Sequence, residues 1–223
     1  MPLISHRGAA HLDIANSAAA ISEGDAYQPA YIEIDINCTS DDVLVIYHGS
    51  ISRFLQGKKL KETFAELHTR FPDLLTLEHV LSIKTTAPFL FDVKVLDEES
   101  LDKIQTALKS YSRDDFIFTS PHEKALVYLK KHFPAAKIFQ SQPYHHGPVT
   151  ALEIARKHGF EGIALNKWWL TPLIYKMCRM HGKQIAAYTI DSAAAMWIAQ
   201  KMFPGCYIIT NRPHVYRRLF PTA

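Results

Sequence analysis

Two carboxylates alternate with isoleucines in the segment from Tyr31 to Asn37. Side chains of a strand point to opposite faces in turn, so the isoleucines share one face and Glu33 and Asp35 share the other. Two neighbouring carboxylates that lose water are costly unless a cation or a proton compensates them. Carboxylate oxygens suit Mg²⁺ or Ca²⁺, so the pair indicates a site for a divalent cation. The alternative is an exposed strand face with two ordinary acids.

The segment from Phe89 to Val95 repeats this pattern. Its aromatic and β-branched side chains share one face, whereas Asp92 and Lys94 share the other. Asp92 would add a third carboxylate to the predicted metal site. Lys94 would bind a phosphate oxygen or offset the negative charge of the acids. A surface ion pair between Asp92 and Lys94 is the alternative, and it becomes weaker when the two strands are considered together.

Two histidines follow short apolar runs, His6 after the first run and His48 after another. In a barrel of parallel strands, the carboxyl ends of the strands are where catalytic groups gather. Arg7 offers a planar, two-pronged donor for a phosphate, and Gly8 would let the backbone approach a ligand closely. The chain has twelve histidines, most of them expected to be structural, but two at strand ends beside acidic strands favour a catalytic pair.

These residues need strands and helices that position them. Nine short segments have the composition of strands: 2–5, 30–37, 43–47, 88–95, 115–120, 136–140, 162–166, 184–190 and 207–211. Helical patterns separate most of them: 17–27, 77–83, 98–110, 123–132, 150–158, 171–181 and 192–202. Ser17, Thr150 and Thr171 are predicted N-caps, and Gly159 and Gly182 are predicted to end helices in the left-handed conformation.

The alternation of strands and helices predicts a parallel sheet with crossover helices. About eight such repeats fit a closed TIM (β/α)8 barrel better than an open sheet. The polar segment 49–76 interrupts the rhythm and predicts a small inserted lobe after the second strand. No linker rich in Pro, Gly or Ser divides the chain, so we expect residues 1–223 to form a single domain.

Composition narrows the possible functions. The net charge is +3, and the basic runs are short, so a nucleic-acid partner is not expected. Cys38, Cys178 and Cys206 are odd in number and far apart, which argues against a disulfide framework or a zinc site. No signal-peptide pattern and no apolar run of the length of a membrane span is present, so we expect a cytoplasmic protein with a small-molecule partner. The oligomeric state stays open.

The order of these motifs resembles the glycerophosphodiester phosphodiesterase family. The resemblance begins with His6-Arg7-Gly8 and Asn16-Ser17 and continues with Glu33-Ile34-Asp35, His48 and Asp92-x-Lys94. It extends through Arg53 and Gly57 in the inserted segment, Leu75–Leu81, Phe118–Ser120, Gly182–Ile190 and Ile208–Pro213. Each motif is weak alone, but the ordered set spans the whole chain.

Membership would imply a TIM barrel with an inserted lobe and a metal-dependent hydrolase. The resemblance implies Glu33, Asp35 and Asp92 as ligands of one divalent cation, Mg²⁺ or Ca²⁺. It implies His6 and His48 as the general acid and base, and Arg7 and Lys94 as the residues near the phosphate. The expected reaction cleaves a glycerophosphodiester to an alcohol and glycerol phosphate. A cyclic phosphate is a plausible intermediate on the same grounds.

Six positions depart from the family pattern: Ala15, Gly49, Asp92, Tyr188, Asp191 and Asn211. Gly after the second His and Asp-x-Lys on the third strand also occur in the related sphingomyelinase D-like branch. One alternative is therefore a lysophospholipase D-like or sphingomyelinase D-like enzyme that releases a cyclic phosphate. Another is a catalytically eroded phosphate-binding module, because Ala15 stands where the family has a carboxylate. Trp168 and Trp169 would contact an alcohol or acyl group in the first alternative, but a hydrophobic plug under a loop is the favoured interpretation.

Overall fold

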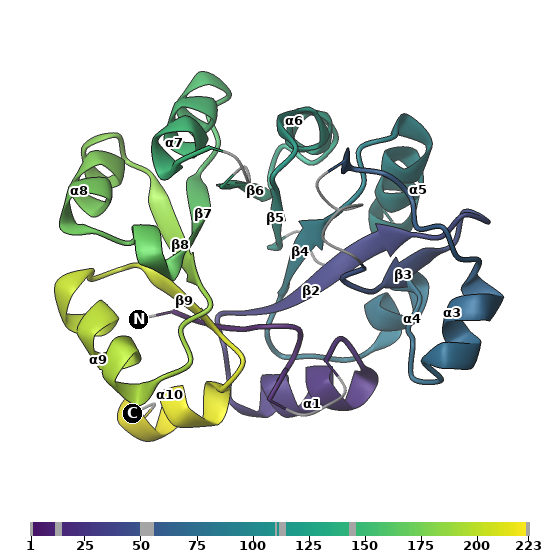
Figure 1. Cartoon of the computed structure of the whole chain (residues 1–223), viewed down its shortest axis with the longest axis horizontal. Coiled ribbons are helices and arrows are strands. Elements are labelled where there is room, and N and C mark those ends of the chain that lie inside the picture. Colours follow the sequence, from purple (N-terminus) through teal and green to yellow (C-terminus); the bar gives the residue numbers. More distant parts are fainter. Residues whose placement is uncertain are drawn as a thin grey trace.

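Eight parallel strands form a closed barrel in the computed structural model of the chain (Figure 1), which describes residues 2–11, 15–49, 56–109, 111, 115–142 and 146–221. The strands are β1 (Leu3–Ser5), β2 (Tyr31–Cys38), β4 (Phe89–Val93), β5 (Ile117–Ser120), β6 (Lys137–Ser141), β7 (Gly162–Asn166), β8 (Gln184–Tyr188) and β9 (Tyr207–Thr210). Strand β1 pairs with both β2 and β9, and these two pairings close the sheet. The predicted TIM barrel is therefore confirmed.

Helices surround the barrel (Figure 1). They are α1 (Ala18–Ala26), α4 (Leu77–Ser82), α5 (Glu98–Lys109), α6 (Glu123–His132), α7 (Pro148–Lys157), α8 (Pro172–Met180), α9 (Ala193–Met202) and α10 (Pro213–Leu219). A single 3₁₀ turn, η1 (Lys167–Trp169), follows β7. Helix α10 was not predicted, because Pro213 and the short length of the segment masked its pattern.

Local capping chemistry explains several of the helix ends. The side chains of Ser17 and Thr171 accept hydrogen bonds from the first turns of α1 and α8, as predicted. Gly159 and Gly182 follow α7 and α8 with φ of 66° and 65°, the left-handed conformation expected of them. The prediction of Thr150 as an N-cap is wrong. Helix α7 begins at Pro148, a residue whose fixed φ suits the first helical position.

Because side chains alternate along each strand, the barrel has two apolar cores, one outside the strands and one inside. Ile32, Ile34 and Ile36 pack in the large outer core between strands and helices. A second, inner cluster fills the barrel: Ile4, Tyr31, Leu90, Ile117, Phe139, Ala164, Ala186, Tyr207 and Ile209. Glu33 and Asp35 are only 3% and 1% exposed, and both line the cavity at one end of the barrel. The alternative of an exposed acidic strand face is therefore wrong.

The segment after β2 forms the inserted structure. It starts with β3 (Leu44–Ile46), which pairs antiparallel with β2 and so lies outside the parallel barrel. Helix α3 (Phe64–Arg70) follows, and it begins with a capping box between Thr63 and Glu66. The polarity of this segment concealed α3, which buries little more than Leu67 in a small apolar cluster with Val45 and Leu60.

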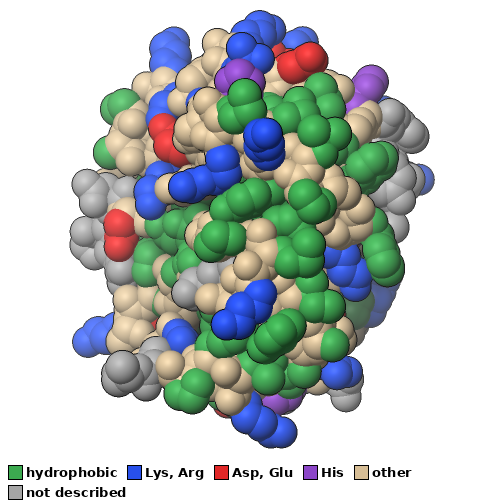
Figure 2. All heavy atoms as spheres, turned by 90° about the vertical axis from the view of Figure 1, so that its left-hand side faces the viewer, with side chains coloured by type: hydrophobic (Ala, Val, Ile, Leu, Met, Phe, Trp, Pro, Cys, Tyr) green, Lys and Arg blue, Asp and Glu red, His purple; other side chains and the backbone are tan. Residues whose placement is uncertain are grey.

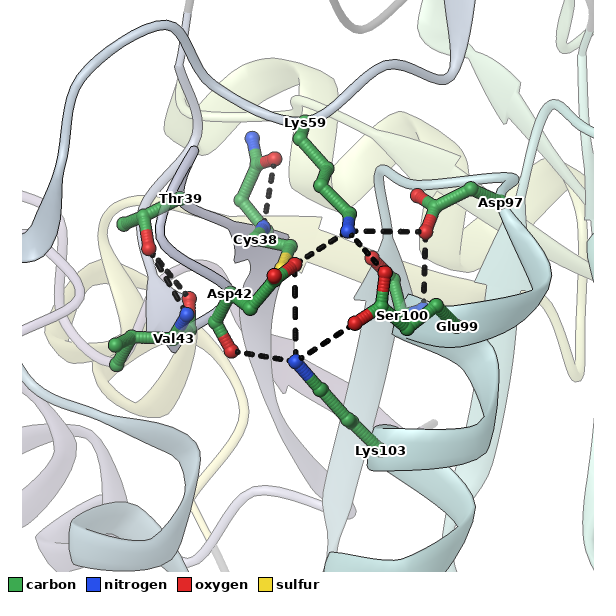
Figure 3. Close-up of polar contacts among 10 residues, drawn as sticks. Cys38, Thr39, Asp42, Val43, Lys59, Asp97, Glu99, Ser100 and Lys103 are labelled. Atoms are coloured by element: carbon green, nitrogen blue, oxygen red, sulfur yellow. Dashed lines mark hydrogen bonds and ion pairs between the residues drawn. The ribbon is translucent and has the colours of Figure 1, made fainter.

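A cluster of ion pairs joins the inserted segment to α5 (Figure 3). Lys59 lies 2.9 Å from Glu99 and also contacts Asp42 and Asp97. Lys103 lies 3.2 Å from Glu99 and 3.6 Å from Asp42. Nearby, Gly57 accepts a backbone hydrogen bond from Leu96, just beyond the end of β4. These contacts hold the insertion beside the carboxyl end of the barrel.

The described parts of the chain contain no helix that is both long enough and apolar enough to cross a bilayer. Cys38, Cys178 and Cys206 are all buried thiols without a disulfide.

Candidate active site

All seven predicted site residues line one cavity of about 240 Å³ at the carboxyl end of the barrel: His6, Arg7, Glu33, Asp35, His48, Asp92 and Lys94. Strands β1, β2 and β4 carry or immediately precede six of them, and His48 follows β3. The barrel therefore gathers into one wall residues that are up to 88 positions apart in sequence (His6 to Lys94).

The three carboxylates offer oxygen atoms that all lie within 4.8 Å of one another. Lys94, itself buried, lies 2.8 Å from Asp35 and also contacts Asp92. The Nε atom of Arg7 lies 3.0 Å from Asp35, and the Arg7 backbone N–H donates to Glu33 at 2.8 Å. Three acids thus share two cationic side chains at the centre of the site.

These charges, together with burial, shift the pKa values of the three acids in different directions. Burial opposes ionisation of Asp35, but the charges of Lys94 and Arg7 prevail and hold its pKa below the usual value. Burial, together with the charges of Asp35 and Asp92, raises the pKa of Glu33 well above its usual value. Burial is also the main cause of the raised pKa of Asp92. The acidic cluster is therefore short of positive charge.

A divalent cation fits this cluster. The Oδ1 atom of Asp92 is buried and has no hydrogen-bond partner among the described residues. Buried carboxylate oxygens are normally paired or bound to a metal. Three oxygen donors at this separation, together with a surplus of negative charge, suit a hard cation such as Mg²⁺ or Ca²⁺.

His6 is held by an amide that sequence reasoning had not included in the site. Its Nδ1 atom lies 2.6 Å from Oδ1 of Asn211. The side-chain NH₂ and the backbone N–H of Asn211 both donate to Asp191, at 2.8 Å each. Because the Asp191 carboxylate can only accept, it fixes which way the Asn211 amide points. Nδ1 of His6 must therefore carry the proton, and Nε2, 3.7 Å from Glu33, holds the lone pair.

The two histidines differ in their surroundings. Burial, aided by the charge of Arg7, lowers the pKa of His6 to about 4. Burial also lowers the pKa of His48, but the negative charge of Asp35 opposes that shift. Nδ1 of His48 lies 3.1 Å from the carbonyl oxygen of Gly49. Gly49, one of the six departures, thus contacts the imidazole through its backbone.

Asn16 is a second buried amide absent from the predicted site. Its side chain donates to Asp35 at 2.9 Å, and its Oδ1 accepts from the Asp35 backbone N–H at 3.3 Å. Ala15, immediately before it, is exposed and does not line the cavity. Tyr188 and Gln142 do line the cavity. The sequence signal for Asn16, Asp191 and Asn211 was the family resemblance, which includes Asn16 in its Asn-Ser motif and counts Asp191 and Asn211 among its departures.

Two interpretations from the sequence are wrong. Gly8 approaches a helix and not a ligand: a Cβ atom there would lie 2.4 Å from the carbonyl carbon of Ala20. Trp168 and Trp169 are not a buried plug, because their side chains are exposed on η1. Arg53, which is part of the resemblance, lies outside the described residues.

Solved structures with the same fold come from several organisms. A phosphodiesterase of Oleispira antarctica, in complex with the product sn-glycerol-3-phosphate, is 18% identical with a TM-score of 0.84, covering 100% of this chain and 97% of the other. A glycerophosphodiester phosphodiesterase of Parabacteroides distasonis is 21% identical, with a TM-score of 0.78 and coverage of 98% and 95%. A glycerophosphodiester phosphodiesterase of Thermotoga maritima is 17% identical, with a TM-score of 0.75 and coverage of 97% of each chain.

At these identities the solved structures establish the fold. No curated protein sequence matches the chain significantly. The model of the glycerophosphoryl diester phosphodiesterase family matches residues 6–215, nearly the whole chain, from His6 to a point within α10. On the strength of that match, the chain belongs to the glycerophosphoryl diester phosphodiesterase family, a family of hydrolases.

Proposed function

We propose that this protein is a metal-dependent hydrolase that cleaves glycerophosphodiesters to an alcohol and glycerol phosphate. The observation that carries the proposal is the buried acidic cluster, short of positive charge, with two imidazoles in the same cavity wall. Family membership supports phosphodiester chemistry. The Oleispira antarctica relative binds sn-glycerol-3-phosphate as its product, which agrees with the products proposed here.

Glu33, Asp35 and Asp92 would hold the divalent cation, Mg²⁺ or Ca²⁺. When bound, such a cation supplies charge neutralisation to the phosphoryl oxygens. Arg7 lines the cavity and presents a guanidinium for the phosphate. Lys94 contacts both Asp35 and Asp92, which favours a role in offsetting their charge at the edge of the phosphate site.

His6 is assigned as the base of the first step. Its Nδ1 proton is committed to Asn211, so Nε2 is available to accept a proton from the attacking glycerol hydroxyl. The hydroxyl oxygen then bonds to phosphorus as the bond from phosphorus to the alcohol oxygen breaks. His48, which lines the same cavity, donates a proton to the departing alcohol. Each positioned proton transfer contributes roughly 10²–10⁴-fold to the rate.

The product of this first step is a cyclic phosphate. Its hydrolysis uses the same two histidines in exchanged roles: His48 removes a proton from water and His6 returns a proton to the glycerol oxygen. The second step regenerates the starting protonation states and yields glycerol phosphate.

A second candidate is a lysophospholipase D-like enzyme that releases the cyclic phosphate. The exposed Trp168 and the apolar groove that it lines with Leu170, Ile190 and Phe203 favour this alternative, because an acyl chain needs an apolar surface close to the catalytic cavity. In a third candidate, an eroded phosphate-binding module, the same cavity would bind a phosphodiester without cleaving it.

Phosphorus NMR of the products distinguishes the three candidates. The purified protein is incubated with glycerophosphocholine, glycerophosphoethanolamine or lysophosphatidylcholine in Mg²⁺, Ca²⁺ or chelator. Metal-dependent formation of glycerol phosphate, lost in His6→Ala and His48→Ala and retained in His132→Ala on α6, supports the proposed function. A persistent cyclic phosphate from the lyso-lipid would establish the second candidate. Phosphodiester binding without turnover in any metal would establish the third.

A further inference from the structure

All three tryptophans of the chain are exposed, with 80% of Trp168, 46% of Trp169 and 53% of Trp197 accessible to solvent. Leu173 of α8 and Ile198 and Met202 of α9 are exposed as well. We call these six side chains the tryptophan face. Figure 2 views the molecule from the side of α8 and α9, where hydrophobic side chains gather with lysines and arginines between them.

The elements of this face contact one another. Trp168 of η1 and Ile198 of α9 line one groove. Tyr175 of α8 packs against Phe203 at the end of α9, with ring centroids 5.4 Å apart. Large apolar side chains usually lie inside a protein, and a contiguous group of them outside marks an interaction surface.

Cations accompany the aromatic rings. Lys167 lies 5.3 Å from the ring centre of Trp168, and Lys201 lies 5.9 Å from that of Trp197. From Gly162 to the end of the chain there are eight Lys and Arg residues and a single acid, Asp191. That acid is engaged with Thr210 and Asn211. The chain as a whole has a net charge of only +3, so positive charge is concentrated in its C-terminal part.

We propose that the tryptophan face docks on the surface of an anionic lipid bilayer. Tryptophan rings favour the boundary between lipid headgroups and acyl chains. Lysine and arginine side chains bring positive charge to anionic headgroups while their alkyl stems stay against apolar surface. A second copy of this chain is a poorer occupant, because two such faces would bring like charges together.

The face lies beside the catalytic cavity. Asp191 lines the groove of Trp168 and also orients Asn211, which contacts His6 in the cavity wall. Docking would therefore bring the catalytic end of the barrel to the lipid surface. If the second candidate function holds, on which this step alone depends, the enzyme would take phosphodiester headgroups presented by the membrane, such as those of lysophospholipids.

Vesicle binding tests the docking directly, because every tryptophan of the chain lies in the face and emission reports on it without labelling. The full chain is titrated with vesicles of phosphatidylcholine alone or with one quarter phosphatidylglycerol, with brominated lipids as quenchers. We expect a blue shift, quenching and co-sedimentation with the anionic vesicles, weakened by salt. Pure phosphatidylcholine should bind at least tenfold more weakly.

Two pairs of variants locate the surface. The double variant Trp168→Ser, Trp197→Ser should lose at least tenfold in vesicle partitioning, whereas Val127→Ser, Val149→Ser on α6 and α7 should bind normally. Lys167→Glu, Lys201→Glu should lose roughly fivefold or more for each lysine. The matched change of net charge on α6, Lys124→Glu, Lys131→Glu, should have a much smaller effect. Far-UV circular dichroism of each variant checks that it is folded.

Equal binding to both vesicle types, or equal loss in the control variants, would overturn the proposal. A dimer would also overturn the proposal if its tryptophan emission is already blue-shifted without lipid and if Trp168→Ser converts it to a monomer. Turnover of glycerophosphocholine is measured in parallel on the unaltered chain. Turnover without vesicle binding refutes the docking alone, and vesicle binding without turnover refutes the proposed function alone.

Discussion

His6 illustrates how one side chain acquires a defined chemical state. Its imidazole is oriented by Asn211, which is oriented in turn by Asp191. Two departures from the family pattern, Asp191 and Asn211, therefore form one hydrogen-bonded unit. In this unit the carboxylate of Asp191 accepts both hydrogen bonds from Asn211, which leaves the Asn211 side-chain oxygen to face the imidazole.

Replacing Asn211 tests this positioning role. In Asn211→Ala, His6 loses the acceptor for its Nδ1 proton, and we expect kcat to fall roughly 10- to 100-fold with KM little changed, since general-base catalysis is worth 10²–10⁴-fold. Asn211→Asp should recover much of the rate. Its carboxylate should also raise the pKa of His6, so that the acidic limb of the pH–rate profile moves to higher pH.

Asn166→Ala is the matched control, since Asn166 ends strand β7 and does not line the cavity. Its kcat should stay within a fewfold of the unaltered protein. Equal losses in both alanine variants, or no recovery in Asn211→Asp, would show that Asn211 supports the fold and not the tautomer of His6.

At the scale of elements, the site depends on how closely β1 and its following turn approach α1. Gly8 has φ of 78°, and its Cα faces the backbone of Ala20. Arg7 and His6 directly precede this glycine. The glycine of the His-Arg-Gly motif thus sets the distance between the segment that carries His6 and Arg7 and the first helix.

The substitution Gly8→Ala should destabilise the protein by about 2–4 kcal/mol, because backbone strain and a buried overlap act together. Gly159→Ala separates the two causes. That glycine has φ of 66° but open space around it, so its loss should cost only about 1 kcal/mol. Urea denaturation measures both values. Equal costs for the two variants would mean that the contact with α1 relaxes freely.

The insertion is held to α5 by ion pairs that depend on pH. Hydrogen bonds from Lys59 lower the pKa of Asp42 and, with Lys103, that of Glu99. Carboxyls with lowered folded-state pKa values contribute stability above their unfolded values, and that contribution is lost as pH falls through the folded values. Lys59→Met should therefore be less stable than the unaltered protein at pH 7, and the difference should shrink towards pH 3.

Urea unfolding at both pH values and at two salt concentrations measures this difference. Lys61→Met removes a charge from the same segment, and Lys61 is exposed and outside the cluster of Figure 3. A stability difference between Lys59→Met and the unaltered protein that does not change with pH would exclude the ion pairs as its source.

At the scale of the whole molecule, closure of the barrel brings residues from both ends of the sequence together. Strand β1 pairs with β9, and His6 donates its backbone hydrogen bond to Thr210. Neither half of the sequence can complete the site alone. We therefore propose that residues 1–223 form a single domain, insertion included.

This proposal predicts one cooperative unfolding transition. Circular dichroism reports on helices around the entire barrel, whereas tryptophan emission reports only on η1 and α9. The two urea curves should coincide and yield the same midpoint, as two-state behaviour requires. Separate midpoints would indicate that the insertion or the C-terminal part unfolds on its own.

Much of the secondary structure, and the strand faces on which the acids lie, can be predicted from local sequence patterns. Period-two alternation was enough to predict that Glu33 and Asp35 share one face of their strand and that Asp92 and Lys94 share one face of theirs, because successive strand side chains point to opposite faces. Nine strands and seven helices were predicted from composition and hydrophobic pattern, which are also local signals. The weak or polar patterns of α3 and α10 concealed two more helices.

The rest was decided by tertiary structure. The contact between His6 and Asn211 joins residues 205 positions apart and depends on the pairing of β1 with β9. The support of Asp35 by Asn16 depends on the turn after β1, where Asn16 takes a positive φ. The exposure of Trp168 and Trp169 to solvent depends on which elements pack beside η1. Local sequence specifies which way a side chain points, but only the packed barrel determines what it meets.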